Sequence, residues 1–338
     1  MVDTLLRQVA LVSESEQIDP GDLTRVSAAL QKQVTRDLVQ FWDVKATVDA
    51  FPQLEDVPIG YWPIIIKDNI GFNAAGIHLD KDHQPFALVT ASKERDVWSL
   101  TTSHELIEML VDPFGNRLMA GDSPKPDQTR VQFLVEACDP PEADEFAYTV
   151  NGILVSDFYS VRFFDPVAAP GVRYSFTGAI RQPREVLRGG YLSWLDVASD
   201  DWWQETWFSG NRPTFRNLGP MDAANGSFRT QIDRLTSEAR SRAMSGGLRA
   251  ARAAGLSATE TDRIAVTRAA RLRQQIDHLT SRGSGRNGDS GEAASVDRAK
   301  PIGTAAKWRS GERGSAGKSS VPAADADELR TAPAVWDR

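Results

Sequence analysis

The sequence predicts an α+β fold with a β-rich second half, followed by a helical segment and a disordered C-terminal tail. The first observation is the element order before residue 113, where apolar patterns indicate a strand, a helix, four more strands and a second helix. The second is composition, because residues 1–215 are rich in Trp, Phe, Ile and Val and the later residues are not. We therefore expect a globular domain over 1–215, a helical segment over 216–282 and a disordered tail over 283–338.

Each element has its own pattern. A first strand is indicated by TLLRQVALVSES, and a helix by DPGDLTRVSAALQKQVTRDLVQFW, which opens with turn residues and then places Leu23, Val26 and Leu30 at helical spacing. Four further strands are predicted by KATVDAF, YWPIIIKDNI, AGIHLD and PFALVTA. Later, Asn151-Gly152 is a strong hairpin signal. A β-rich wall is predicted by GGYLSWLDVASDDWWQETWF, whose Trp residues we interpret as core.

Composition excludes several classes of protein. The chain has 338 residues, a net charge of -7 and 41% hydrophobic residues, and this acidic balance argues against nucleic-acid binding by the whole chain. The single cysteine, Cys138, excludes an internal disulfide and a cysteine metal cluster. No long apolar run and no secretory signal are visible, so we expect a cytoplasmic protein without a membrane helix.

The segment 222–282 is basic, with 11 Arg, no Lys and 6 acids, which gives 11 − 6 = +5. Its pattern indicates two or three amphipathic helices broken at Gly246-Gly247. Such helices could contact an acidic partner or RNA, but they lack interleaved aromatic residues, which favours a solvated coiled or docking segment. From Gly283 onward the chain is rich in Gly, Ser, Ala and charge, and this composition cannot offset the entropy of ordering.

The predicted helix SHELIEMLVDP, residues 103–113, carries one His, three acids and no Lys or Arg. On a helical wheel at about 100° per residue, Glu108, Asp112 and Glu105 fall within about 100° of His104. The rest of the circumference is apolar, so we expect a largely buried helix whose polar stripe faces a cleft. Carboxylates packed together there repel one another, and a divalent cation removes that penalty.

Other interpretations of this helix remain open. If it begins at Thr102, Glu105 completes a capping box, whereas a start near Asp96 leaves Glu105 in the helix interior and free for chemistry. An ordinary solvated face usually includes Lys or Arg partners, which are missing here. Asp112 precedes Pro113, and this position is typical of a turn residue.

The run His104-Glu105-Leu-Ile-Glu108 resembles the His-Glu-x-x-His helix of zincin metallopeptidases, with Glu in place of the second His. The resemblance implies that His104 and Glu108 bind the metal and that Glu105 is the general base for a metal-bound water. Together with the downstream VEACDP, the helix is also similar to exordium-like and related bacterial proteins that pair His-Glu-x-x-Glu with Glu-x-x-Asp. The resemblance covers about residues 55–165 and implies a zincin-like mixed β-sheet with an active-site helix.

Further candidate ligands lie outside the helix. Glu136 ends an apolar stretch, where a partly buried carboxylate needs a partner, so we predict it as the third ligand. Asp139 is predicted as an acceptor that orients His104, and an acidic loop is the alternative for both residues. Asp112 and Asp157 are reserve ligands.

His78 lies on the second-last predicted strand before the helix. It either faces the cleft, as a ligand or oxyanion donor, or is a half-exposed surface residue.

The sequence thus leads to two functional hypotheses. The first is a metal-dependent hydrolase with Glu105 as general base. More specifically, we expect a peptidase that acts on a peptide or protein substrate. The second is a non-catalytic, metal-stabilised module that presents its basic helical tail to a partner. Zinc is the first expectation for the metal. Manganese and calcium are the alternatives, because the set holds one His and several carboxylates.

Overall fold

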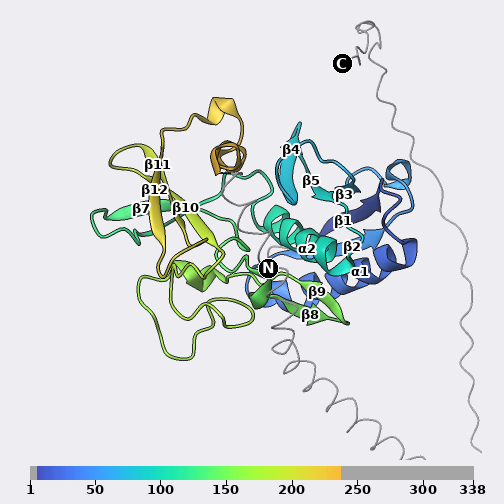
Figure 1. The fold of residues 1–338 in the computed structure, drawn as a ribbon, viewed down its shortest axis with the longest axis horizontal. Coiled ribbons are helices and arrows are strands. Elements are labelled where there is room, and N and C mark those ends of the chain that lie inside the picture. The colour runs from blue at the N-terminus through green and yellow to red at the C-terminus, as the bar shows by residue number, and fades with distance from the viewer. Residues whose placement is uncertain (1–5, 237–338) are drawn as a thin grey trace, which may run out of the picture. The chain divides into compact units, whose positions relative to one another are not determined.

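The computed structural model describes residues 6–236, all of which belong to one unit spanning Met1–Leu279 (Figure 1). The predicted disordered tail and most of the predicted helical segment, including its break at Gly246-Gly247, lie outside the described residues. The domain boundaries therefore stay a prediction. Strand β12 (Thr214–Gly219) runs across the boundary expected at residue 215.

The first half of the chain forms a five-stranded mixed sheet in the order β2-β1-β3-β5-β4. Strand β1 is parallel to β2 and β3, β3 is parallel to β5, and β4 is antiparallel to β5 at the sheet edge. The predicted strands and the α+β class are thus confirmed. The bounds are β1 Leu6–Ser13, β2 Lys45–Ala50, β3 Trp62–Lys67, β4 Gly76–Lys81 and β5 Gln84–Thr90.

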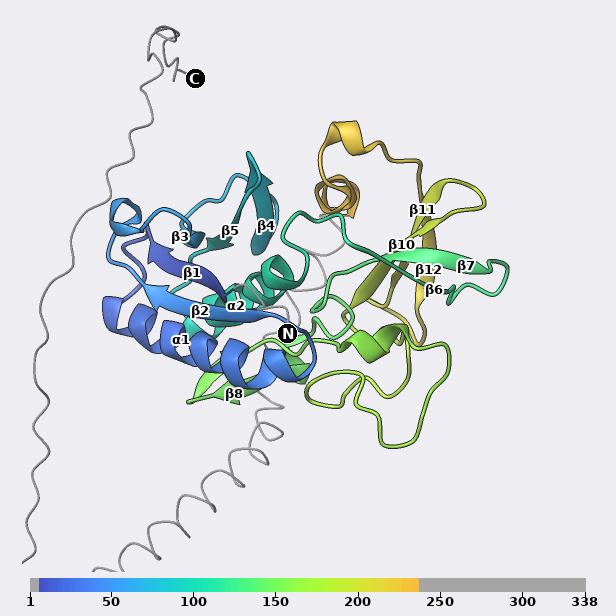
Figure 2. The same cartoon turned by 180° about the vertical axis from the view of Figure 1, so that it is seen from behind.

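Helix α1 (Pro20–Lys32) begins where the turn residues predicted it. The side chain of Asp19 accepts a hydrogen bond from the N–H of Asp22, and proline occupies the first turn, where its missing N–H costs nothing. The helical path continues as a π-helix, Gln33–Asp37, and a 3₁₀ turn, Leu38–Gln40. Figure 2 shows α1 running beside β1 and β2, with which it packs.

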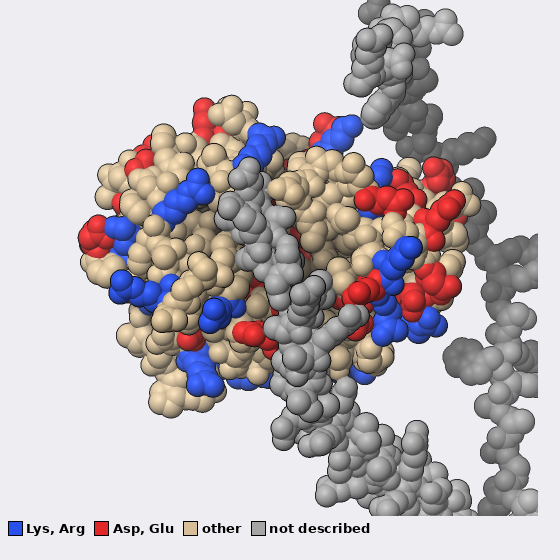
Figure 3. Space-filling view, viewed as in Figure 1, with Lys and Arg blue, Asp and Glu red and all other residues tan. Residues whose placement is uncertain are grey.

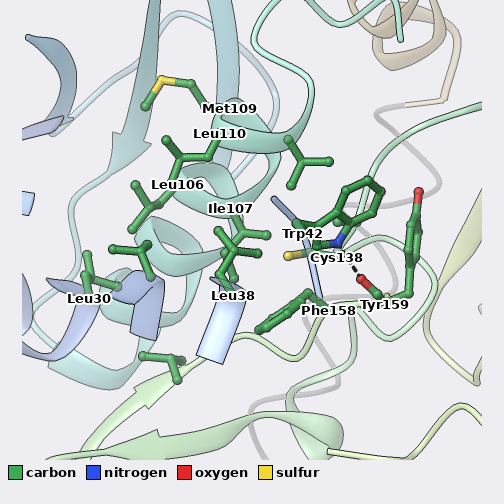
Figure 4. Packing of buried hydrophobic residues seen from close by; sticks show 14 of the residues in the cluster. Leu30, Leu38, Trp42, Leu106, Ile107, Met109, Leu110, Cys138, Phe158 and Tyr159 are labelled. Carbon is green, nitrogen blue, oxygen red and sulfur yellow. Dashed lines mark hydrogen bonds between the residues drawn. The ribbon is translucent and has the colours of Figure 1, made fainter. Parts of the chain in front are cut away.

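Helix α2 (Arg95–Val111) packs against β4, β5 and strand β9. It begins eight residues before Ser103, so Glu105 lies in the helix interior and the capping-box interpretation is wrong. The apolar face of α2 enters the main core together with α1 and the segment around Cys138 (Figure 4). In the same core the indole N–H of Trp42 donates to the carbonyl of Tyr159 at 2.8 Å.

The second half forms an antiparallel sheet in the order β12-β11-β10-β7-β6. A separate hairpin joins β8 and β9 through Asn151 (φ 54°) and Gly152 (φ 75°), the two positive φ angles that a tight hairpin turn requires, so this prediction is confirmed. The predicted β-rich wall is β10 and β11, and Trp194 and Trp202 are buried in it. The bounds are β6 Leu118–Asp122, β7 Arg130–Leu134, β8 Tyr148–Val150, β9 Ile153–Val155, β10 Tyr191–Asp196 and β11 Asp201–Thr206.

Short 3₁₀ turns connect these elements, and one further helix begins at Phe228 and continues to the last described residue, Thr236. The 3₁₀ turns lie at Leu54–Asp56, Asp144–Phe146, Val161–Phe164 and Ala223–Asn225. Within residues 6–236 no helix has the length and apolarity that a bilayer span requires. On the face shown in Figure 3, basic and acidic side chains are interspersed.

Candidate metal centre

Six ionisable side chains from three parts of the chain gather in the interior. Strand β4 supplies His78, and α2 supplies His104, Glu105 and Glu108. The loop after β7 supplies Glu136 and Asp139. None is more than 7% exposed. All four polar residues on the predicted arc of α2, Asp112 included, are buried, and three of them face this cluster rather than water.

Close packing of β4 on α2 brings His78 to the helix. Gly76 on β4 has no Cβ, and a Cβ there would lie 2.6 Å from Thr101 Cγ2 and 2.7 Å from Glu105 Cγ. Such distances are well below van der Waals contact, so a larger residue would force the strand and the helix apart. A small residue at this position therefore sets how closely His78 approaches the acids of α2.

The loop after β7 is fixed by backbone hydrogen bonds. The N–H of Cys138 donates to Glu108 Oε1 at 3.1 Å, and the N–H of Leu187 donates to the carbonyl of Pro140 at 3.0 Å. Gly190 lies so close that a Cβ there would be 2.2 Å from the same carbonyl oxygen. These contacts hold the backbone around Asp139 against α2.

The atoms of His104, Glu108 and Asp139 are spaced as ligands of one ion. His104 Nε2 lies 3.3 Å from Glu108 Oε2 and 3.3 Å from Asp139 Oδ1. All three ligand atoms lie within 4.8 Å of one another. Metal bonds of about 2.0–2.1 Å in tetrahedral geometry place neighbouring ligand atoms roughly 3.3–3.4 Å apart. The side chains present therefore could hold a metal ion.

His78 forms a second group with Glu105 and Glu108. Its Nδ1 lies 3.5 Å from Glu105 Oε2 and 3.8 Å from Glu108 Oε2. The three also meet the spacing of a metal-binding group. His78 is 2% exposed, so the interpretation as a half-exposed surface residue is wrong. Neither ring nitrogen has a hydrogen-bond partner among residues 6–236, and the same holds for His104 Nε2, Glu105 Oε2 and Glu108 Oε2.

Arg229, on the helix that begins at Phe228, is the main site residue that the sequence did not single out. Its Nη1 lies 2.8 Å from Glu136 Oε2, 2.8 Å from Asp139 Oδ2 and 3.4 Å from Glu108 Oε2, and its side chain is 2% exposed. Its Nε donates to Asp233 Oδ2 at 2.9 Å. The sequence offered one weak signal, the Arg–Asp pair at i,i+4 spacing. In the sequence, no other feature distinguishes Arg229 from the remaining arginines of the basic segment.

The cluster holds more acids than permanently charged cations. If Glu105, Glu108, Glu136 and Asp139 are all ionised and the imidazoles are neutral, as required of metal ligands, Arg229 leaves −4 + 1 = −3, and a divalent cation would reduce this to −1. A buried negative charge of this size is costly without a compensating cation.

The pKa shifts in the cluster follow from the same imbalance. Burial raises the pKa of Glu136 well above its usual value; Arg229 opposes this shift and Glu108 adds to it. For His104, burial lowers the pKa, but Glu108 and Asp139 more than reverse this effect and the pKa is raised well above the ordinary value. The carboxylates of Glu108 and Asp139 thus favour the protonated, positively charged form of His104.

Two of the remaining predicted residues, Asp112 and Asp157, are engaged outside the cluster, and Glu136 contacts Arg229 within it. Asp112 closes α2, and its Oδ2 accepts the N–H of Arg117 at 2.7 Å, as expected of a turn residue. Asp157 accepts hydrogen bonds from the N–H and the Oγ1 of Thr177 at 2.9 and 2.6 Å. Glu136, predicted as the third ligand, lies 4.0 Å from His78 Nε2 and contacts Arg229.

Comparison of the chain with protein-family models, curated proteins and solved structures gave no match. The resemblance to zincins therefore stays a prediction from the sequence motif.

Proposed function

We propose that the protein is a metal-dependent hydrolase in which His104, Glu108 and Asp139 hold a divalent cation. The observation that carries the proposal is the pair of 3.3 Å contacts of His104 Nε2 within a buried cluster of four acids and one arginine. The proposal gives Asp139 the ligand role that the sequence analysis gave to Glu136. Zinc suits the short contacts best. Manganese and calcium remain the alternatives, because two of the three ligands are carboxylates.

A metal ion bound at these residues would polarise a substrate carbonyl and lower the pKa of a water molecule. Glu105 is the residue for proton transfer, because it is next to His104 in the chain, is buried, and has an oxygen without a hydrogen bond. His78 contacts this oxygen at 3.5 Å and so orients the carboxylate. Peptides are the proposed substrate class, because β4 is an edge strand beside Glu105 and an extended peptide can pair with such an edge.

A second candidate function is a non-catalytic module stabilised by metal. It is favoured by Arg229, a buried cation that already offsets part of the negative charge and ties the cluster to the helix entering the basic segment. In this candidate the site stabilises the fold, and the basic segment binds a partner.

Metal analysis of protein purified without chelator, combined with Glu105→Gln, tests the proposal. We expect about one divalent ion per chain. Glu105→Gln should retain the metal and a near-parental melting temperature, with hydrolysis of unstructured peptides reduced about 10²-fold or more. Glu94→Gln, on an exposed residue that precedes α2, is the matched control and should behave as the parent.

Three results would count against the hydrolase. If the parent protein contains no metal, the proposed metal site is wrong. Equal turnover by parent and Glu105→Gln would remove Glu105 from the mechanism. Metal that stabilises the parent, without turnover of any peptide, would establish the module instead.

A further inference from the structure

A single guanidinium contacts both acids of the loop that follows β7. Arg229 Nη1 contacts both Glu136 Oε2 and Asp139 Oδ2 at 2.8 Å. These are charge-assisted contacts between buried side chains, and such pairs are stronger than contacts between neutral groups. The two carboxylates are therefore held in fixed directions by the same group.

The two oxygens of Asp139 have different neighbours. Oδ2 accepts a hydrogen bond from Arg229 at 2.8 Å, whereas Oδ1 lies 3.3 Å from His104 Nε2. Arginine on one oxygen thus turns the other toward the proposed metal position. Glu136 has the opposite arrangement, because the oxygen it directs into the cluster, Oε2, is in contact with Arg229.

The guanidinium itself has little freedom to move. The backbone N–H of Arg229 donates to the carbonyl of Gly115 at 3.1 Å, and the N–H of Phe228 donates to Asn116 Oδ1 at 2.9 Å. A Cβ on Gly115 would lie 2.7 Å from Arg229 Cβ, so the helix and the end of α2 are in close contact. Asp233 fixes the Nε side of the same side chain.

We propose that Arg229 is a positioning residue of the metal centre that assigns the third ligand: it presents Asp139 to the metal and retains Glu136 outside the coordination sphere. This inference rests on the proposed metal site. Its physical reason is that partners of ligating carboxylates set ligand orientation, and their loss typically lowers metal affinity about 10–100-fold. Nη1 contacts both carboxylates while Nε is held by Asp233, and the single ammonium group of lysine cannot make both sets of contacts in this orientation.

The experiment compares zinc affinity in the full-length parent and in variants, by competition with a chelating dye. Arg229→Met/Glu136→Gln removes opposite charges together, so that no new unpaired carboxylate results from this pair. We expect its zinc dissociation constant to rise about 10–100-fold. Arg229→Lys should give an intermediate rise, and Arg234→Met, on an exposed residue of the same helix, should leave the constant at the parental value.

A second arm tests the choice of ligand. In the parent, Asp139→Asn should abolish tight zinc binding, whereas Glu136→Gln should keep one zinc per chain. In Arg229→Met, Glu136 is released and can replace the lost ligand, so Arg229→Met/Asp139→Asn should bind zinc more tightly than Asp139→Asn alone. The visible spectrum of the cobalt-substituted protein should also change in Arg229→Met, because the coordination sphere changes.

The outcomes separate this inference from the metal site itself. Parent protein that binds no zinc overturns both. Parent protein with one zinc, together with an unchanged dissociation constant in both Arg229→Lys and Arg229→Met/Glu136→Gln, overturns the role of Arg229 alone. Loss of zinc in Glu136→Gln but not in Asp139→Asn also overturns it, because the ligand assignment would then be reversed.

Discussion

Glu205 on β11 allows a quantitative prediction that depends on burial and not on the metal. Its side chain is 7% exposed, and Oε2 has no hydrogen-bond partner among residues 6–236. Burial raises its pKa from 4.5 to about 7. At about 1.36 kcal/mol per pH unit, the difference between 4.5 and 7 corresponds to roughly 3 kcal/mol in the free energy of unfolding.

The sign follows from proton linkage. The folded protein binds this proton more tightly than the unfolded chain, so the contribution is present below pH 4.5 and is lost as the pH rises through about 7. Glu205→Gln keeps the shape and stays neutral. It should therefore match the parent near pH 4.5 and be more stable than the parent by about 3 kcal/mol at pH 8.5.

Urea unfolding at several pH values measures this difference. Parent and variant share all other titrating groups, so those contributions cancel in the comparison. Glu55→Gln, on an exposed residue, is the control for a Glu-to-Gln substitution outside the core. A stability difference between Glu205→Gln and the parent that stays constant from pH 4.5 to 8.5 would refute the reasoning.

Two further predictions concern the cluster. His104→Ala and Glu108→Ala should each lower bound metal well below one per chain, measured by elemental analysis, and parental metal content in both would exclude this site. Gly76→Ala should cost about 1–3 kcal/mol of stability and weaken metal binding, because its Cβ would lie 2.7 Å from Glu105 Cγ. Gly60→Ala, at a position with open space but a φ of 96°, introduces backbone strain without crowding the cluster, so only Gly76→Ala should affect the metal.

The sequence predicted the structure best where the spacing of side-chain types matches the geometry of a regular helix or turn. The regular spacing on α2 predicted that its polar stripe is enclosed, and the Asn151-Gly152 pair predicted the hairpin. The loop after β7 has no period, so the direction of Glu136 and Asp139 could not be derived from their spacing of three. It depends on Arg229, which is distant in the chain and resembles its neighbours in type. Long-range pairing of this kind leaves no local pattern to recognise.

The separation between Asp139 and Arg229, 90 residues along the chain, also determines the order in which the cluster is completed. At about 5–20 residues per second, a ribosome needs roughly 5–18 s to synthesise that interval. Throughout it the nascent chain already contains the four carboxylates and both histidines, but not the guanidinium. An ion available during synthesis would meet these acids before Arg229 has been synthesised, whereas an ion arriving later would meet a cluster in which Arg229 already contacts the acids. Metal supply during translation would then influence which occupant the site acquires first.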